Sequence, residues 1–314
     1  MTCPLLSRVR TIAVKAEAVP GTKESLLAAN ATINVFDPII QQTAEMVDRD
    51  QQGGMGYLPA VPDSRLGTCT FTTELIADSL IPLWATVLLP ACGIGDDTGG
   101  VFSMSVIPPG CAGATQHTIT IGMYENGLFK CIYGAMGNVK FTMVSGKRVS
   151  AEFTFTGIWA EPTDVAILAP TYPAAPVLRF VDSAFQIGTW TPRIEMLTID
   201  TGNNVIVRED STTDSGYSYA VIANRRPVGT INPEATLVAT KDIFGEWIGG
   251  TEAAFSAACG SGDDSVTFTA GGCQWLNPQE GDRNGLAINA IDFGLNDDDL
   301  TVTLDTTSAT TFAP

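Results

Sequence analysis

Alternation of apolar and polar residues is the dominant pattern of this chain. In LGTCTFTTELI, residues 66–76, Cys69, Phe71, Thr73 and Leu75 fall on one side, a period of two that predicts a β-strand. Comparable alternation occurs in HTITIGMY, GLFKCIYGA, KFTMV, SAEFTFTGI, RIEMLTID, NVIVRE, YSYAVIA, SVTFTA, LAINAIDF and DLTVTLD. Gly, Pro, Asn and Asp separate these segments, and Asn126-Gly127 is a strong hairpin-turn signal. The pattern predicts a mainly β, antiparallel protein.

Two segments depart from this period and predict short helices. They are SLIPLWATVLLPACG, residues 79–93, and GGTEAAFSAACG, residues 249–260. Pro82 suits the first turn of the first helix. Gly93 and Gly260 stand where a left-handed cap ends a helix.

The two predicted helices end matching stretches. ACGIGDD begins at residue 91 and ACGSGDD at residue 258, and the offset of 167 holds back to Thr73 and Thr240 without a gap. On this alignment PEATLVATKDI, residues 233–243, repeats the strand LGTCTFTTELI. The match predicts an internal duplication.

A later pair of segments supports the duplication. GKRVSAEFTFTG starts at Gly146 and GDRNGLAINAIDFG at Gly281, and each is a Gly-x-Arg turn followed by a strand that ends in Gly. The Pro-rich segment 161–176 is the natural hinge between the copies. We therefore predict two domains, residues 1–165 and 166–314.

Composition narrows the function. The chain has 34 acidic and 17 basic residues, a net charge of −17, and no cluster of Lys and Arg, which argues against sequence-specific DNA binding. Seven cysteines without a CxxC spacing predict buried, reduced thiols. The sequence has no apolar run of about 18 residues and no secretory leader pattern, so no membrane role is expected.

No set of residues predicts catalysis or metal binding. His117 is the single histidine, and neither a nucleophile elbow nor a phosphate-binding loop is present. The acidic runs at residues 96–97, 263–264 and 297–299 lack the ligand spacing of a calcium loop. We expect no catalytic residue, metal or cofactor. An acidic β-sandwich glycosidase with an unidentified carboxylate pair is the alternative from a different functional class.

The order of several motifs resembles that of the tail tube (major tail) proteins of tailed bacteriophages. The motifs are VKAEAVPGTKESL, AEMVDRDQQGGMG, LPAVPDSRLGTCTFTTEL, the segment from PLW to LLPACG, GAMGNVKFTMVSGKRVSAEFTFTG and NRRPVGTINPEATL. Together they cover most of residues 8–295. The resemblance implies a structural protein of the virion tail, assembled in the host cytoplasm, with other tail proteins as partners at the tube ends.

The resemblance also implies an architecture. Each of the two tandem domains would be a β-sandwich or barrel-like unit with one short helix, and its inner sheet would join neighbouring sheets in a closed ring β-barrel. Stacked rings would form the tube that conducts DNA, as non-specific cargo, from capsid to host. Because the family usually builds six-membered rings from single domains, two copies per chain imply a homotrimeric, pseudo-hexameric ring. A hexamer, the tube of a contractile injection particle, and a head decoration or surface β-sandwich protein are the alternatives.

Residues for these roles follow from the resemblance and from charge. An acidic bore would repel DNA phosphates, so the lumen-facing candidates are Glu74, Glu152, Glu195, Asp200 and Asp292. The polar stretch 41–63 suits a loop that orders only when rings stack, with 208–217 as its counterpart. The inter-ring candidates in it are Glu45, Asp48, Arg49 and Asp50.

Overall fold

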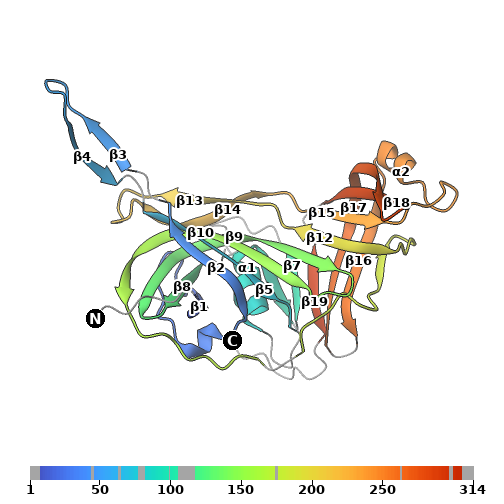
Figure 1. Cartoon of the computed structure of the whole chain (residues 1–314), viewed down its shortest axis with the longest axis horizontal. Helices are drawn as coiled ribbons and strands as arrows, with labels where there is room; N and C mark the ends of the chain where they lie inside the picture. Colours follow the sequence, from blue (N-terminus) through green and yellow to red (C-terminus); the bar gives the residue numbers. More distant parts are fainter. Residues whose placement is uncertain are drawn as a thin grey trace.

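A computed structural model describes residues 8–43, 46–62, 65–76, 82–98, 100–104, 117–173, 176–261, 264–296 and 300–305. The protein is mainly β (Figure 1). Strands make up 61% of the residues that the structure describes. The elements of the first half are β1 (Arg10–Ala16), η1 (Ala28–Ala31), β2 (Val35–Gln42), β3 (Met46–Asp50), β4 (Tyr57–Pro62), β5 (Leu66–Glu74), η2 (Trp84–Leu88), α1 (Leu89–Ala91), β6 (Ile94–Thr98), β7 (Val101–Met104), β8 (Ile119–Glu125), β9 (Leu128–Val144) and β10 (Ser150–Asp164). Those of the second half are β11 (Phe185–Ile187), β12 (Ile194–Asp200), β13 (Asn203–Glu209), β14 (Tyr217–Arg225), β15 (Val228–Pro233), α2 (Ile243–Gly249), β16 (Glu252–Ser261), β17 (Asp264–Arg283), β18 (Leu286–Leu295) and β19 (Thr301–Asp305).

Eight strands of the large sheet run side by side in the order β2-β5-β10-β9-β12-β15-β18-β17, all antiparallel. The first four strands form the first quartet and the last four the second quartet. Within each quartet we number the strands first to fourth by their order in the sequence. In both quartets the fourth strand, β10 or β18, lies between the second and the third. Strands β9 and β12 join the two quartets into one surface.

A second layer in each half is built on the first part of the long third strand. Strand β8 pairs with β9 and β1 pairs with β8; in the second half β16 pairs with β17 and β11 pairs with β16. The β6–β7 hairpin of the first half pairs with β19 and so extends the second layer of the second half. The continuous helical segment η2–α1 is buried among these strands, with Trp84 and Leu88 at most 1% exposed.

Several local predictions are confirmed. Alternation in β5 places Cys69, Phe71 and Thr73 in the core, each at most 2% exposed. Asn126 and Gly127 form the turn between β8 and β9 with φ of 47° and 104°, the left-handed values that such a turn requires. The cysteines that the structure describes are buried thiols; they are Cys69, Cys92, Cys131, Cys259 and Cys273.

Two local predictions are wrong. Most of the predicted helix 249–260 is the strand β16, which begins at Glu252, and the observed helix α2 ends at Gly249, just before it. Residues 234–242 contain no strand; the pairing strand β15 ends at Pro233. The gap-free alignment therefore equates the end of a helix, at Cys92, with the middle of a strand, at Cys259. The segment Phe255-Ser-Ala-Ala-Cys is rich in small residues, which fit either period, and pairing with β11 and β17 decides for a strand.

The proposed hinge begins inside a strand, because β10 continues to Asp164. Residues 165–173 carry no helix or strand. The domain boundary near residue 165 stays a prediction, since the eight-stranded run is continuous across the two halves. Among the described residues, none of the helices has the length and apolar character that crossing a bilayer requires.

A buried carboxylate predicts how stability depends on pH. The Glu125 side chain is 10% exposed and bonds to Arg10 (2.7 Å) and Lys130 (3.2 Å). Burial alone raises the pKa of this carboxyl, but hydrogen bonds from Arg10 and Lys130 outweigh burial, and the pKa is lowered from 4.5. A lowered folded pKa stabilises the fold above the unfolded value and ceases to do so as pH falls through the folded value.

We therefore expect Glu125→Gln to lower the free energy of unfolding at pH 7 and to lose this deficit between about pH 5 and pH 3. Urea unfolding across that range measures it. The exposed Glu161→Gln is the matched control and should show no such closing difference. A constant deficit at every pH would contradict the assignment.

Candidate functional site

The eight-stranded run has one apolar and one polar face. Phe153, Phe141, Ile199 and Phe293 point into the core, while the residues between them point the other way. Strand pairing sets the opposite residues in two rows. The longer row crosses seven strands and consists of Glu74, Ser150, Thr142, Thr198, Thr230, Asp292 and Asn277. The shorter row consists of Thr72, Glu152, Lys140, Asp200 and Val228.

Four of the five acidic residues predicted to line a bore share this polar face: Glu74, Glu152, Asp200 and Asp292. Glu152 and Asp292 occupy corresponding places, since each lies on the fourth strand of its quartet opposite a threonine, Thr72 or Thr230. The fold thus gathers side chains from residues 74–292 onto one surface. Whether that surface lines a bore stays a prediction.

Cations that the sequence pattern did not single out also occupy this face. Lys140 lies between Glu152 and Asp200 in the shorter row. Lys140 and Arg226 also line a depression of about 400 Å³ with Asp200 and Asp292. The Asp200 carboxylate accepts hydrogen bonds from Asn138 Nδ2 and the Gly202 N–H, both at 2.8 Å. The sequence gave no sign that Lys140 belongs to this face. Its position between two acids depends on the pairing of β9 with β10 and β12.

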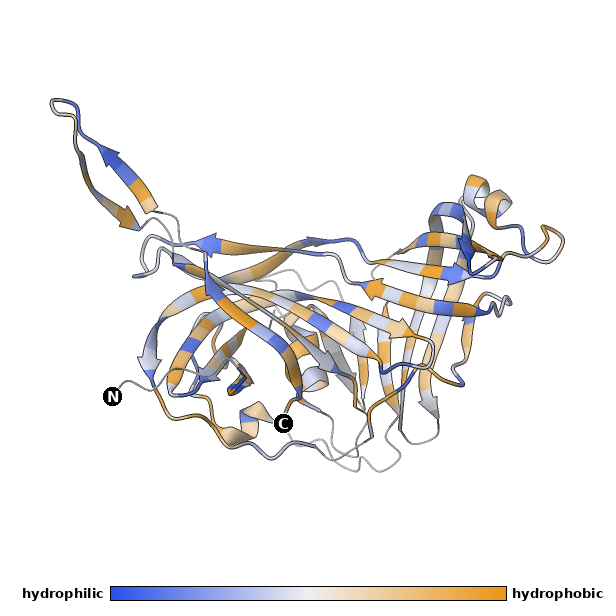
Figure 2. Cartoon of the chain, in the orientation of Figure 1, coloured by the Kyte–Doolittle hydropathy of each residue, from blue (hydrophilic) through white to orange (hydrophobic). Residues whose placement is uncertain are grey.

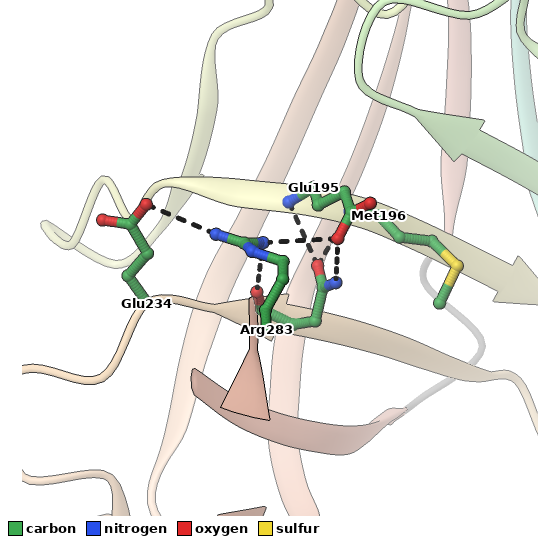
Figure 3. Close-up of polar contacts among 5 residues, drawn as sticks. Glu195, Met196, Glu234 and Arg283 are labelled. Atoms are coloured by element: carbon green, nitrogen blue, oxygen red, sulfur yellow. Dashed lines mark hydrogen bonds and ion pairs between the residues drawn. The ribbon is translucent and has the colours of Figure 1, made fainter. Parts of the chain in front are cut away.

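Glu195 lies apart from the other four acids, at a bulge where β12 begins (Figure 3). The amide oxygen of Asn232 accepts hydrogen bonds from the backbone N–H groups of Glu195 (3.1 Å) and Met196 (2.8 Å). Arg283 lies 3.6 Å from the Glu195 carboxylate and 3.3 Å from that of Glu234. Glu195 therefore belongs to an ion-pair cluster at the end of the sheet.

The two Gly-x-Arg segments place their arginines alike, although only the first is a turn as predicted. Gly146 has a φ of 78°, whereas Gly281–Arg283 are the paired end of β17 and the turn follows at Asn284 and Gly285. Arg283 follows Gly281 and reaches Glu234, just after the second strand of its quartet. Arg148 follows Gly146 and lies 3.5 Å from Glu74, at the end of the corresponding strand β5. Each arginine thus links the turn between the third and fourth strands to the end of the second. The sequence match is explained by a repeated structural contact.

Two strand edges of the eight-stranded run are open. Among the described strands, β2 pairs with β5 alone, and the second part of β17, residues 275–283, pairs with β18 alone. The run does not close into a barrel within the part of the chain that the structure describes. Open strand edges favour pairing with another chain.

Each quartet carries an extended hairpin between its first and second strands. We call β3–β4 arm 1 (residues 46–62) and β13–β14 arm 2 (residues 203–225). Arm 1 projects away from the body, whereas arm 2 lies along the first half (Figure 1). A Cβ on Gly134 of β9 would lie 3.2 Å from Tyr219 Cα, which shows how closely arm 2 packs on β9.

The prediction of an irregular loop at residues 41–63 is corrected by these hairpins. Asp48, Arg49 and Asp50 lie in the exposed strand β3, which pairs with β4 from Met46 to Asp50. Glu45 lies outside the described residues. The counterpart segment 208–217 is the tip of arm 2. Alternating polarity is weak in arm 1, so its strands gave little sequence signal.

Comparison with known proteins decides what this arrangement serves. A family model described as phage tail tube protein matches residues 7–308. The chain belongs to the phage tail tube protein family. No curated protein matches it.

A tail tube protein is a structural component of the virion tail that assembles with copies of itself. The family match confirms the resemblance read from the order of motifs. It accords with the two open strand edges, since such edges favour pairing with another chain.

Proposed function

We propose that three copies of this chain form a ring in which six quartets enclose a bore, and that stacked rings conduct DNA from capsid to host. The observation that carries the proposal is the β9–β12 junction. There the third strand of the first quartet pairs with the first strand of the second quartet. Pairing β17 of one copy with β2 of the next would repeat this junction between chains.

Such a ring would satisfy both open edges at once. Three copies of the eight-stranded run supply twenty-four strands. With a spacing of about 4.8 Å and a tilt of about 40°, the backbone diameter would be roughly 48 Å, wide enough for a DNA duplex between the side chains. The shared order of the two quartets supports the internal duplication and the boundary near residue 165, and hence three chains in place of six.

The orientation of the sheet follows from its two faces. The apolar face is already covered by the second layer and the helical segment, so the polar face is the one available to a bore. Glu74, Glu152, Asp200 and Asp292 would then face DNA and repel its phosphates, so that the strand is not retained. Glu195 would lie at the rim. The tip of arm 1, with Asp48, Arg49 and Asp50, would contact the adjacent ring.

Native mass spectrometry and electron microscopy of the purified protein test the ring. We expect a species of three 33.1 kDa chains and annular or tubular particles. A persistent monomer, or small particles on a head surface in place of tubes, would contradict the proposal. A six-chain ring would establish the hexamer, and a sheath around tubes in intact virions would place the protein in a contractile particle.

Charge reversal tests the acidic bore. We expect tubes carrying Glu152→Lys, Asp200→Lys and Asp292→Lys to retain short duplex DNA that wild-type tubes release, because each ring gains counter-charges for phosphates. Retention should fall steeply between about 50 and 200 mM salt. Nuclease protection of the retained DNA measures its position in the bore.

The matched control carries the same charge change at three exposed acids elsewhere, Glu161→Lys, Asp164→Lys and Asp182→Lys. DNA attracted to those lysines should stay open to the nuclease. Equal protection in both variants, or protection in neither, would contradict a bore lined by the polar face.

A further inference from the structure

Arm 2, which belongs to the second quartet, covers the end of the helical segment η2–α1 in the first half. The first-half helix ends at Cys92 and Gly93. Asn203 Nδ2 donates to the Cys92 carbonyl at 2.7 Å, and Arg225 Nη1 donates to the Gly93 carbonyl at 3.0 Å. A Cβ on Gly93 would lie 3.0 Å from the Ile222 side chain. The root of arm 2 therefore covers the end of the helix that precedes it in the row of quartets.

The corresponding helix of the second half, α2, has no such cover from the described residues of its own chain. Both helices follow the second strand of their quartet, and Gly250 ends α2 with φ 63° as Gly93 ends the first with φ 77°. The exposed apolar side chains on and before α2 form what we call the α2 patch. They are Leu237 (79% exposed), Val238 (68%), Phe244 (39%), Trp247 (43%) and Ile248 (79%).

The two tryptophan N–H groups at α2 are bonded within the chain, so the exposed part of α2 is mainly apolar. Trp247 Nε1 donates to the Leu276 carbonyl and Trp275 Nε1 donates to Glu246 Oε2, both at 3.0 Å. These contacts hold α2 on β17 beside residues 275–283, the open part of that strand. The patch and the open edge therefore form one continuous surface.

Arm 1 has the complementary character at its root. Met46, Val47 and Val61 are 60%, 48% and 49% exposed, and Val47 is paired with Val61 across the hairpin. Figure 2 shows apolar residues both at the root of arm 1 and over α2, at opposite ends of the molecule. An exposed apolar patch on each of two surfaces marks an interaction site.

We propose that the α2 patch binds the root of arm 1 from the neighbouring copy in the same ring. The proposal rests on the ring described above and repeats between chains the contact that arm 2 makes within one chain. Only the root is used, so the tip with Asp48, Arg49 and Asp50 stays free to contact the next ring. The arm thereby links closure of a ring to the surface on which the next ring stacks.

Photo-crosslinking in isolated single rings tests this contact. A benzophenone side chain replaces Ile248, which is exposed enough to accept it, and rings are formed from a mixture of isotopically heavy and light chains. We expect crosslinked peptides from residues 46–62 that join heavy to light chains. The same probe at Val165, which is 41% exposed and lies outside the α2 patch, should not label arm 1 of another copy.

A pair of variants supplies a second readout. Met46→Lys with Val61→Lys should raise the protein concentration needed for half-maximal ring formation roughly tenfold or more, because it places charges on the surface that the contact would bury. Met55→Lys at the fully exposed tip should leave that concentration unchanged.

Rings without a 46–62 crosslink, or a crosslink that appears only in stacked tubes, would overturn the arm contact and leave the ring intact. Absence of rings in the wild-type protein would overturn the ring itself.

Discussion

A chain with cysteines in place of Phe36 and Gln279 is expected to become a covalent ring of three when a short thiol-reactive linker is added. Both positions lie on open edges, Phe36 on β2 and Gln279 on β17. Electrophoresis under denaturing conditions should show nearly complete conversion of the 33.1 kDa chain to the three-chain product. Each chain supplies one cysteine to each of its two junctions. Three linked chains therefore form a closed ring with no unreacted end, and the reaction stops at that product.

The register follows from the junction inside the chain. There Thr142 lies opposite Thr198. Thr198 faces Thr230 on the second strand of its quartet, and Phe36 faces Thr72 on the second strand of the other. Phe36 therefore corresponds to Thr198. On the other side of the junction, Lys140 faces Glu152, and Thr142 is two residues further along β9. In the second quartet Asn277 faces Asp292, and Gln279 is two residues further along β17. Gln279 therefore corresponds to Thr142. Because Glu152 and Asp292 correspond, Gln279 of one copy should meet Phe36 of the next, with Cβ atoms about 5 Å apart.

Two controls make the result specific. Thr142→Cys with Thr198→Cys should link within a chain and give no oligomer. Phe36→Cys with Gly281→Cys is out of register by two residues and should react less. Efficient linking at Gly281 and not at Gln279 would refute this register, and products of six chains would refute the trimer. Wild-type protein accounts for any reaction of native cysteines.

Replacing Phe153 with alanine is expected to cost about 3–5 kcal/mol of unfolding free energy. Phe153 is fully buried at the centre of the first quartet. Its ring lies 5.7 Å from that of Phe71 and 5.9 Å from that of Phe155, so truncation removes contacts on two sides and leaves a cavity between strands β5 and β10. Urea unfolding of the unassembled chain measures the loss.

The next residue provides the control. Thr154 lies on the same strand with its side chain on the polar face and is exposed. Thr154→Ala should change stability by no more than about 0.5 kcal/mol. A cost below about 1 kcal/mol for Phe153→Ala, or equal costs for the two variants, would contradict the assignment of the apolar face to the core.

The acidic candidates show how far alternation alone carries a site prediction. Glu74, Glu152, Asp200 and Asp292 were chosen from strands with mixed alternation, and period two placed each on the face away from the core. Glu195 lies outside the two rows on this face because a bulge at the start of β12 shifts the alternation by one residue. The bulge is held by Asn232, which is 37 residues away in the sequence.

The mistaken helix at residues 249–260 has a related cause. Phe255, Ala257 and Cys259 alternate as a strand requires, but the small residues between them fit a helix equally well. Local preference did not separate the two states. The long-range partners decided for a strand, because β17 pairs along residues 252–261 and β11 pairs with residues 255–257 on the other side.

The sequence by itself determined the strands with strong alternation, the turn at Asn126 and Gly127, the excess of acidic over basic residues, and an order of motifs that leads to the tail tube family. The tertiary structure decided which strands are neighbours, which acids share a face, and which edges stay open. The physical reason is the distance along the chain over which each kind of interaction acts. Alternation and turn chemistry act over a few residues, whereas the β9–β12 junction, the position of Lys140 between two acids and the exposed α2 patch depend on contacts between residues far apart in the chain.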